Sequence, residues 1–307
     1  MGRAFRRPPP LAQGDAVRLI RPAGAYDAQA LEAGMKILAD MGLRPQLGPP
    51  DSFAPTPYYA GDLAARTADL AAALVDDGAT ALWAARGGSG TAQVLAEAEG
   101  ALARRLQQRP PWLLGFSDIT ALHGRFGHHG VMSVHGANVA NLASWAPGAQ
   151  EELWAMVRQP GPHEAVYPGT VLLAPPTGTP PSGPVVGGNL TVLASLCGTG
   201  LLPSWRGCVL LLEDIDERPY RLDRCLHQLM AAGALDGVRA IVLGQLTRCD
   251  DPQGRYTALD LLGPTLAPLG VPVLTGVAVG HEPQSRAILL GAHGTVDVAG
   301  AVLEVRG

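Results

Sequence analysis

Ser117 is a residue whose type and position suggest a catalytic nucleophile. It lies in the sequence LGFSD at 114–118, between an apolar run and a helical pattern. A serine on a sharp strand-to-helix turn exposes its hydroxyl above the edge of a sheet, and the next backbone N–H, that of Asp118, can face a developing oxyanion. Ile119 replaces the second glycine of the usual G-x-S-x-G pattern, however, and Ser117 or Asp118 also fits as a cap of the following helix. Ser117 is therefore a candidate nucleophile, with helix capping as the alternative.

A matching acid and base stand in the second half of the chain. An apolar run at 208–212 leads directly into Glu213 and Asp214. A carboxylate at the end of a strand can hold a histidine in the tautomer that accepts a serine proton. Asp214 also fits as a loop cap, whereas Glu213 ends the apolar run. His281, in VGHEP at 279–283, lies on a loop constrained by a glycine and a proline. It is the best histidine candidate for a general base.

A glycine-rich turn, RGGSG at 86–90, follows a predicted strand and precedes a predicted helix. Backbone N–H groups of such a turn can converge on an anion or an oxyanion, and a tight turn without a ligand fits equally well. The turn matches neither the phosphate-binding loop nor the dinucleotide fingerprint, so we expect no nucleotide cofactor. Four histidines cluster in the sequence, His123, His128, His129 and His135. Their spacing is not that of a metal chelate, so we expect no metal site.

Strands and helices alternate along the first half of the chain. The patterns predict strands at 16–20, 80–85 and 112–115, and helices at 28–41, 62–75, 91–105 and 118–126. This alternation predicts a parallel sheet covered on both faces. Ligands of such sheets bind beyond the carboxyl ends of the strands, where the glycine turn and Ser117 follow their strands.

Prolines and glycines crowd the segment 161–184, which predicts a linker. It would separate an N-terminal α/β domain of residues 1–160 from a C-terminal domain of residues 185–307. For the second domain we expect helices from 189 and at 220–232. We also expect strands at 208–212, 240–243, 271–274, 287–290, 295–298 and 302–305. The fold class is therefore α/β, with a mixed second domain.

Composition excludes several classes of function. The chain has 307 residues, 47% of them hydrophobic and 16% charged, with a net charge of −4. It carries no basic footprint for nucleic acid and no polybasic membrane patch. No apolar run is long enough to span a bilayer, and none has the form of a signal peptide. The four cysteines show neither zinc nor disulfide spacing, as expected in a reducing cytoplasm. These features favour a cytoplasmic protein that binds neither nucleic acid nor membrane.

Seven short segments, taken in order, resemble the LD-carboxypeptidase family of serine peptidases, which also includes the microcin C immunity peptidases. They are ARGG at 85–88, GFSDITAL at 115–122, HG at 135–136, GGNL at 187–190, LED at 212–214, PYRLDR at 219–224 and VGH at 279–281. Each segment alone is a weak signal, but the common order and spacing are specific. The resemblance extends from Gly14 to Pro283.

The resemblance implies an N-terminal flavodoxin-like domain, a C-terminal domain with a β-rich core, and a site between them. It implies Ser117 as nucleophile, His281 as general base and Glu213 as the acid that orients it. The backbone N–H groups of Gly88 and Asp118 would form the oxyanion hole. The implied activity is hydrolysis of the L,D-peptide bond to the terminal D-alanine of murein tetrapeptides in peptidoglycan recycling. The implied assembly is a homodimer.

Some positions depart from the family pattern or stay open. Ser89 stands where the family usually has an aromatic residue, which puts an aromatic contact from that position in doubt but not the backbone role of the glycines. Ala137 replaces a frequent proline, a local backbone change. Arginines that could hold the carboxylate of the substrate are Arg86, Arg221 and Arg224, although the last two could instead pair with Glu217 or Asp223 along their helix.

Two other functions are alternatives. A microcin C immunity-type peptidase would cleave peptidyl or aminoacyl nucleotides, and it would need aromatic residues to stack a base, for which Trp205 and Tyr256 are the candidates. A protein of another class would only bind a small ligand between the domains. A binding protein has no need for a serine, an acid and a histidine together, so the sequence favours an enzyme.

Overall fold

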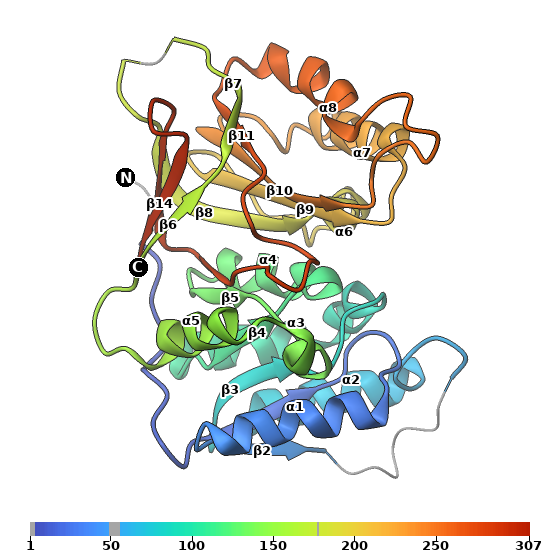
Figure 1. Ribbon diagram of the computed structural model, residues 1–307. Coiled ribbons are helices and arrows are strands. Elements are labelled where there is room, and N and C mark those ends of the chain that lie inside the picture. The colour runs from blue at the N-terminus through green and yellow to red at the C-terminus, as the bar shows by residue number, and fades with distance from the viewer. Residues whose placement is uncertain (1–3, 49–55, 177) are drawn as a thin grey trace.

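Two β-sheets, each built mainly from one half of the chain, form the frame of the molecule in the computed structural model (Figure 1). The structure describes residues 4–48, 56–176 and 178–307. No helix among these residues combines the length and the apolar character needed to cross a bilayer.

The N-terminal sheet has six strands in the order β12-β5-β4-β3-β1-β2. The strands are β1 (Ala16–Ile20), β2 (Arg44–Leu47), β3 (Ala79–Ala84), β4 (Trp112–Gly115), β5 (Ser133–His135) and β12 (Ile288–Leu290). The first five run parallel, and their order 2-1-3-4-5 is that of flavodoxin-like folds. Strand β12 arrives from the far end of the chain and pairs antiparallel with β5. The expected flavodoxin-like half is confirmed, with one added edge strand.

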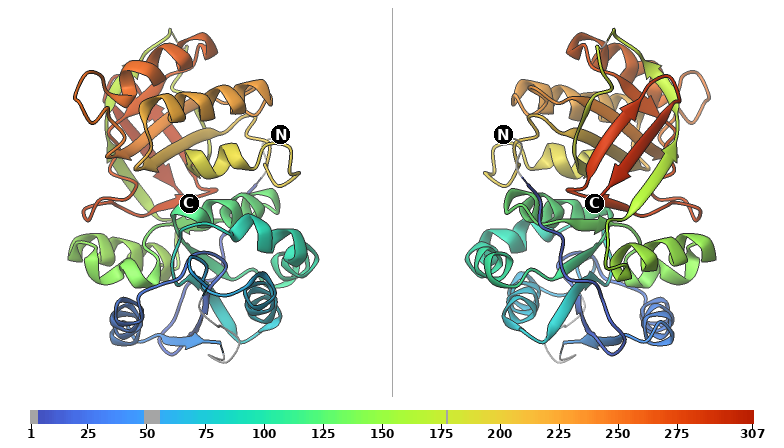
Figure 2. Two further views of the ribbon diagram at one scale, coloured as in Figure 1. Left: turned by 90° about the vertical axis from the view of Figure 1, so that its right-hand side faces the viewer. Right: turned by 90° about the vertical axis from the view of Figure 1, so that its left-hand side faces the viewer.

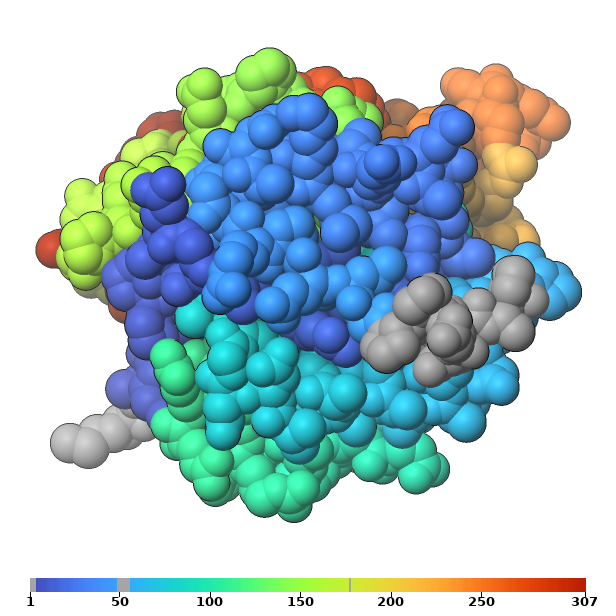
Figure 3. Space-filling model, turned by 90° about the horizontal axis from the view of Figure 1, so that it is seen from below, coloured from blue at the N-terminus to red at the C-terminus, as the bar shows by residue number. Residues whose placement is uncertain are grey.

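Helices cover both faces of this sheet (Figure 2). On one face lie α1 (Ala28–Asp40) and α5 (Pro147–Arg158), and on the other α2 (Leu63–Val75), α3 (Thr91–Gln108) and α4 (Thr120–His128). Neighbouring side chains of a strand point to opposite faces. In β3, Leu82 therefore packs with α2 and α3, whereas Trp83 packs with α1 and α5. The face turned away from the C-terminal half is formed largely by α1, β2, α2 and α3 (Figure 3).

The C-terminal sheet has eight strands in the order β6-β14-β13-β8-β9-β10-β11-β7. They are β6 (Glu164–Pro168), β7 (Thr170–Leu173), β8 (Ser182–Asn189), β9 (Val209–Ile215), β10 (Ala240–Thr247), β11 (Val273–Thr275), β13 (His293–Asp297) and β14 (Val302–Arg306). Strands β8 to β11 run parallel, and the rest pair antiparallel. One face is covered by α6 (Leu190–Ser195), α7 (Pro219–Ala231) and α8 (Ala258–Leu266). This is the expected mixed sheet.

The segment 161–184, predicted as a linker, contains β6, β7 and the first residues of β8. Strands β6 and β7 are the two edge strands of the C-terminal sheet, and Pro168 ends β6. Proline is tolerated at sheet edges because one side of an edge strand makes no ladder hydrogen bonds. Pro168 thus marks a sheet edge rather than a linker, whereas Pro184 lies in the interior strand β8. The division of the chain into two domains stays a prediction.

The predicted elements of the first half lie within a few residues of the observed ones, and the strand at 112–115 has the predicted bounds. The strand predicted at 208–212 continues as β9 to Ile215. Glu213 and Asp214 therefore lie inside this strand rather than beyond its end. The short strands β2 and β5 and the helices α5 and α8 were not predicted from sequence.

Candidate active site

Ser117 begins a short 3₁₀ turn (Ser117–Ile119) directly after β4, and its backbone is left-handed, with φ 64°. A residue with a β-carbon pays about 1–2 kcal/mol for this conformation. The preceding residue is extended, and the Phe116 N–H donates to Asn138 Oδ1 at 3.2 Å. The chain therefore makes the sharp, strained turn that raises a hydroxyl above the carboxyl edge of a sheet.

Asp118 caps a helix, but not the one that follows it. Its carboxylate accepts hydrogen bonds from the backbone N–H of Thr91, at 2.8 Å, and from the Thr91 hydroxyl, at 2.6 Å. Thr91 begins α3, whose own N-cap residue, Gly90, has no side chain to do so. Burial raises the pKa of Asp118, and the Thr91 hydrogen bonds oppose this shift. The Asp118 carboxylate thus ties the turn of Ser117 to the glycine turn before α3.

The glycine turn lies against the nucleophile candidate. A β-carbon on Gly87 would stand 2.9 Å from Ser117 Cβ and 3.1 Å from Ser117 Oγ, so only glycine allows this approach. The carbonyl oxygen of Gly87 is held by the N–H of Gly24 at 2.9 Å, in the loop after β1. The N–H of Gly88 donates no hydrogen bond within the described residues. A free N–H in the turn that approaches Ser117 is what an oxyanion hole requires.

Glu213 and His281 form a close pair in the C-terminal half. The distance from His281 Nδ1 to Glu213 Oε2 is 2.7 Å. Glu213 is fully buried, whereas the His281 side chain is 10% exposed. Asp214 makes different contacts: it accepts from Asn189 Nδ2 and from the backbone and hydroxyl of Thr191, and so stabilises the start of α6. Geometry therefore separates the two neighbouring carboxylates.

The loop of His281 is held by Gln245, which sequence reasoning missed. The Oε1 of Gln245 accepts from the N–H of Glu282 at 3.3 Å and from the hydroxyl of Ser285 at 2.5 Å. The Gln245 N–H donates to the carbonyl of Val279 at 2.8 Å. Gln245 lies where the pairing of β10 with β9 is irregular, and such a bulge can re-aim a side chain. A lone glutamine in a strand gives no signal of this role in the sequence.

Phe116 brings the two halves of the site together. The centroid of its ring lies 4.6 Å from that of His281, and its neighbour in the chain is Ser117. The Ser117 hydroxyl and the His281 ring form no hydrogen bond among the described residues, and such contacts are often long in free enzymes. The structure thus gathers the glycine turn, Ser117, Glu213 and His281 at one place between the sheets.

The four clustered histidines divide into two pairs. His123 and His135 are buried beside the site, whereas His128 and His129 lie at the end of α4, where His129 Nε2 is 3.3 Å from a Glu99 carboxylate oxygen. His123 bonds the Ser133 hydroxyl at 2.8 Å and the Gly115 carbonyl at 2.9 Å. Because the carbonyl can only accept, His123 carries its proton on Nε2. Burial lowers the pKa of His123 to about 4.

The three candidate arginines are exposed. Arg86 donates to the carbonyl of Ala25 beside the glycine turn. Arg221 and Arg224 lie on α7 and both stack near the Tyr220 ring, while Arg221 Nη1 stands 3.5 Å from Glu217 Oε2. For Arg221 this is the pairing predicted as the alternative to substrate binding, although Glu217 lies just before α7. Among the described residues, neither α7 arginine contacts the Glu213–His281 pair.

A cavity of about 510 Å³ lies elsewhere, between α4 and the segment 200–208. Its wall includes His123 and the buried Trp205, but not Ser117, Glu213 or His281. The cavity therefore lies beside His123 and is not part of the candidate site.

Known proteins agree with this architecture. Residues 17–136 match the LD-carboxypeptidase N-terminal domain, and residues 182–296 match the LD-carboxypeptidase C-terminal domain. A putative carboxypeptidase of Synechocystis is 32% identical over 303 residues, which is 95% of each chain. The chain belongs to the LD-carboxypeptidase family. It is therefore a member of a serine-type peptidase family, as the resemblance of the short segments implied.

One further relative in sequence and two solved structures are similar to this family member. The murein tetrapeptide carboxypeptidase of Pseudomonas aeruginosa is 33% identical over 287 residues, or 88% of this chain and 89% of the relative. A muramoyltetrapeptide carboxypeptidase of Oxalobacter formigenes shares the fold with a TM-score of 0.81 at 22% identity, over 95% of this chain and 98% of that one. The microcin C7 self immunity protein MccF, in complex with glutamyl sulfamoyl guanosine, also shares the fold, with a TM-score of 0.82 at 21% identity over 98% of both chains.

Proposed function

We propose that this protein is a serine LD-carboxypeptidase that removes the terminal D-alanine from murein tetrapeptides in peptidoglycan recycling. The observation that carries the proposal is the Glu213–His281 pair, at 2.7 Å, in one site with a strained Ser117. Similarity to the murein tetrapeptide carboxypeptidase of Pseudomonas aeruginosa supports the choice of substrate.

The proposed reaction is acyl transfer through a covalent serine ester. Ser117 Oγ attacks the carbonyl carbon of meso-diaminopimelate, and His281 accepts the hydroxyl proton on Nε2 because Nδ1 is engaged with Glu213. The N–H groups of Gly88 and Asp118 hold the oxyanion of the tetrahedral intermediate. His281 then donates the proton to the amine of D-alanine, which leaves. Water, deprotonated by His281, hydrolyses the ester and restores Ser117.

A direct assay tests the proposal. Purified protein is incubated with L-Ala-γ-D-Glu-meso-diaminopimelate-D-Ala, and free D-alanine and the tripeptide are measured by mass spectrometry. We expect the two products in equal amounts, and faster turnover than with an aminoacyl sulfamoyl-adenosine. Turnover of the nucleotide alone would replace the proposal by the immunity-type peptidase.

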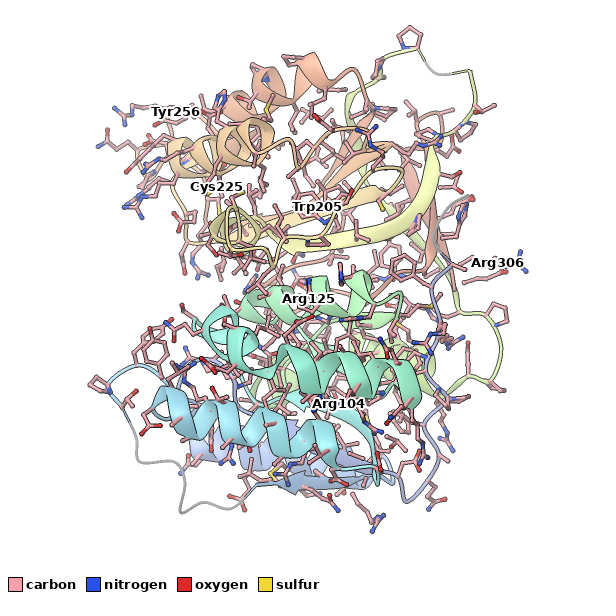
Figure 4. The ribbon with its side chains drawn as sticks, turned by 180° about the vertical axis from the view of Figure 1, so that it is seen from behind. Arg104, Arg125, Trp205, Cys225, Tyr256 and Arg306 are labelled. Carbon is pink, nitrogen blue, oxygen red and sulfur yellow. The ribbon has the colours of Figure 1, made fainter. Side chains whose placement is uncertain are left out.

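That alternative is favoured by the equally close fold of the microcin C7 self immunity protein. An immunity-type peptidase would need an aromatic residue that stacks on the base of the nucleotide. The two candidates, Trp205 and Tyr256, both lie in the C-terminal half (Figure 4) and meet this requirement poorly. Trp205 is only 1% exposed, and Tyr256 is half-buried beside the guanidinium of Arg255. We therefore keep the tetrapeptide as the proposed substrate.

Location and assembly are proposals that rest on the family resemblance and the composition. We propose a cytoplasmic homodimer. The mass of the purified protein in solution, measured by light scattering, tests the dimer, and a monomer at micromolar concentration would contradict it.

A further inference from the structure

Four non-glycine residues among those described have positive φ: Ser117, Asp216, Arg248 and Ala301. Ser117 is the candidate nucleophile, and Ala301 lies in the turn between β13 and β14. The other two, with φ 59° and 55°, are bonded to each other. A left-handed backbone is costly for a residue with a β-carbon, and such strain gathers at functional sites.

The pair stands at the carboxyl ends of two adjacent parallel strands. Strands β9 and β10 pair through Ile215 and Thr247, and the N–H of Asp216 continues the ladder by donating to the Thr247 carbonyl at 2.9 Å. Arg248 Nε and Nη2 each donate to one Asp216 oxygen at 2.7 Å. Both side chains are exposed, at 64% and 63%. An exposed ion pair adds little stability, so it does not by itself account for two strained residues.

The pair adjoins the catalytic candidates. Asp216 follows Glu213 by three positions in the chain, and Gln245, near the end of β10, holds the loop of His281. The Arg248 hydrogen bonds are the main cause of a lowered pKa of Asp216, and the charge of His281 adds to it. Glu282, next to His281, likewise contributes to the raised pKa of Arg248. Arg248 likewise follows Gln245 by three positions, so the ion pair lies about 10 Å farther along the two adjacent strands, at the rim of the site.

We propose that Asp216 and Arg248 bind the zwitterionic end of the meso-diaminopimelate side chain, an assignment that rests on the proposed function. That end carries an ammonium and a carboxylate on one carbon. The carboxylate of Asp216 is complementary to the ammonium, and the guanidinium of Arg248 is complementary to the carboxylate. The Nη1 group of Arg248 donates no hydrogen bond within the described residues, so it is free to bind the substrate carboxylate. The Asp216 oxygens each keep a lone pair for the ammonium.

Paired substrates test the assignment, because lysine is diaminopimelate without the side-chain carboxylate. The kcat/KM for D-alanine release is measured on the tetrapeptide with meso-diaminopimelate and on the same peptide with L-lysine. We expect Arg248→Gln to lower kcat/KM about tenfold or more for the diaminopimelate peptide and to leave the lysine peptide within about threefold. Asp216→Asn, which tolerates the left-handed backbone, should weaken both peptides.

Arg255→Gln is the matched control. Arg255 is 61% exposed and also makes two bonds to an aspartate, Asp251, but its φ is not positive. This variant should leave both peptides unchanged. If Arg248→Gln lowers both peptides equally, the subsite is wrong although the enzyme is a carboxypeptidase. If the unaltered enzyme releases D-alanine from neither peptide, the proposed function falls, and the subsite with it.

A different observation concerns the far side of Glu213. Its Oε1 and both ring nitrogens of His135 are buried without a hydrogen-bond partner among the described residues. His135 Nε2 stands 3.8 Å from Glu213 Oε1, and these side chains are 1% and 0% exposed. This distance is too long for a direct hydrogen bond. Buried polar groups without partners are costly, so two that face each other call for an explanation.

We infer that His135 is a positioning residue, whose Nε2 proton faces Glu213 Oε1 and forms a hydrogen bond to it after a shift of about 1 Å. Both oxygens of the carboxylate are then held, Oε2 by His281 and Oε1 by His135. Burial lowers the pKa of His135 well below its usual range, so the ring is neutral and has one proton to donate. His135 touches no substrate atom in this scheme and acts only through Glu213.

Glutamine and methionine at position 135 separate this role from simple filling of space, because they have similar shapes and only glutamine has an N–H. We expect His135→Met to lower kcat about tenfold with KM unchanged, and His135→Gln to keep kcat within about threefold. Equal losses in the two variants would contradict the role. The unaltered enzyme gives a second readout: ¹⁵N NMR should find the His135 proton on Nε2, and a proton on Nδ1 would overturn the inference.

Discussion

Replacing Ser117 by alanine should abolish release of D-alanine, with kcat/KM lower by about 10⁴-fold or more. Without the hydroxyl there is no covalent ester, and the oxyanion hole alone gives only residual catalysis. The measurement is D-alanine release from the tetrapeptide by enzyme whose folding has been checked by circular dichroism. A Ser117→Ala variant with full turnover would remove the serine mechanism. A serine-directed phosphonate should label the unaltered enzyme but not this variant, and a protein that only binds a ligand would react in neither form.

A Ser117→Gly variant distinguishes the backbone strain at this position from the chemical role of the hydroxyl. Ser117→Gly also lacks the hydroxyl, so it should be as inactive as the alanine variant. Glycine adopts φ 64° without the energetic penalty that a β-carbon causes, whereas alanine has a β-carbon and still incurs that penalty. We expect the glycine variant to be more stable than the alanine variant by about 1 kcal/mol, or roughly 2–4 °C in Tm. A glycine variant less stable than alanine would mean that the turn stores no strain.

The parts of the fold that follow local patterns were predictable from the sequence. Strand β4 is a short apolar run between a helix and a turn, and its bounds agree with the prediction. The flavodoxin-like half, inferred from the family resemblance, is present as well. In such a sheet, the loops after β1, β3 and β4 must meet at one edge. The glycine turn and Ser117 therefore had to be neighbours once the topology was correct.

Contacts between distant segments were not predictable in the same way. Asp118 was a possible cap of the helix after it, yet it caps α3, which begins 27 positions earlier. Gln245 holds the His281 loop through a side-chain carbonyl that any glutamine has. Strand β12 leaves the C-terminal half to pair with β5, although its three buried apolar residues carry no pattern that selects this sheet. In each case the partner is set by tertiary packing, which no local period or propensity encodes.

The two carboxylates of β9 give the second large prediction. Glu213→Gln should lower kcat/KM about 10³–10⁴-fold, because a neutral amide no longer stabilises the imidazolium of His281 or fixes its tautomer. Asp214→Asn should leave kcat/KM within about tenfold and act on stability instead. Asp214 accepts hydrogen bonds from Asn189, from the N–H and hydroxyl of Thr191, and from the N–H of Ile215. An amide group must turn its own N–H toward one of these donors, which costs about 1–3 kcal/mol.

Steady-state kinetics and urea unfolding of the two variants measure both effects side by side. The two substitutions are matched, since each exchanges one carboxylate oxygen for an amide nitrogen at adjacent, buried positions of the same strand. If only Asp214→Asn abolished turnover, the acid would have been assigned to the wrong residue. Loss of activity in both variants, with unfolding in neither, would mean that His281 depends on the position of the whole strand end as much as on one charge. Loss confined to Glu213→Gln ties the chemistry to the 2.7 Å contact between His281 Nδ1 and Glu213 Oε2, because Asp214 shares the strand but not that contact.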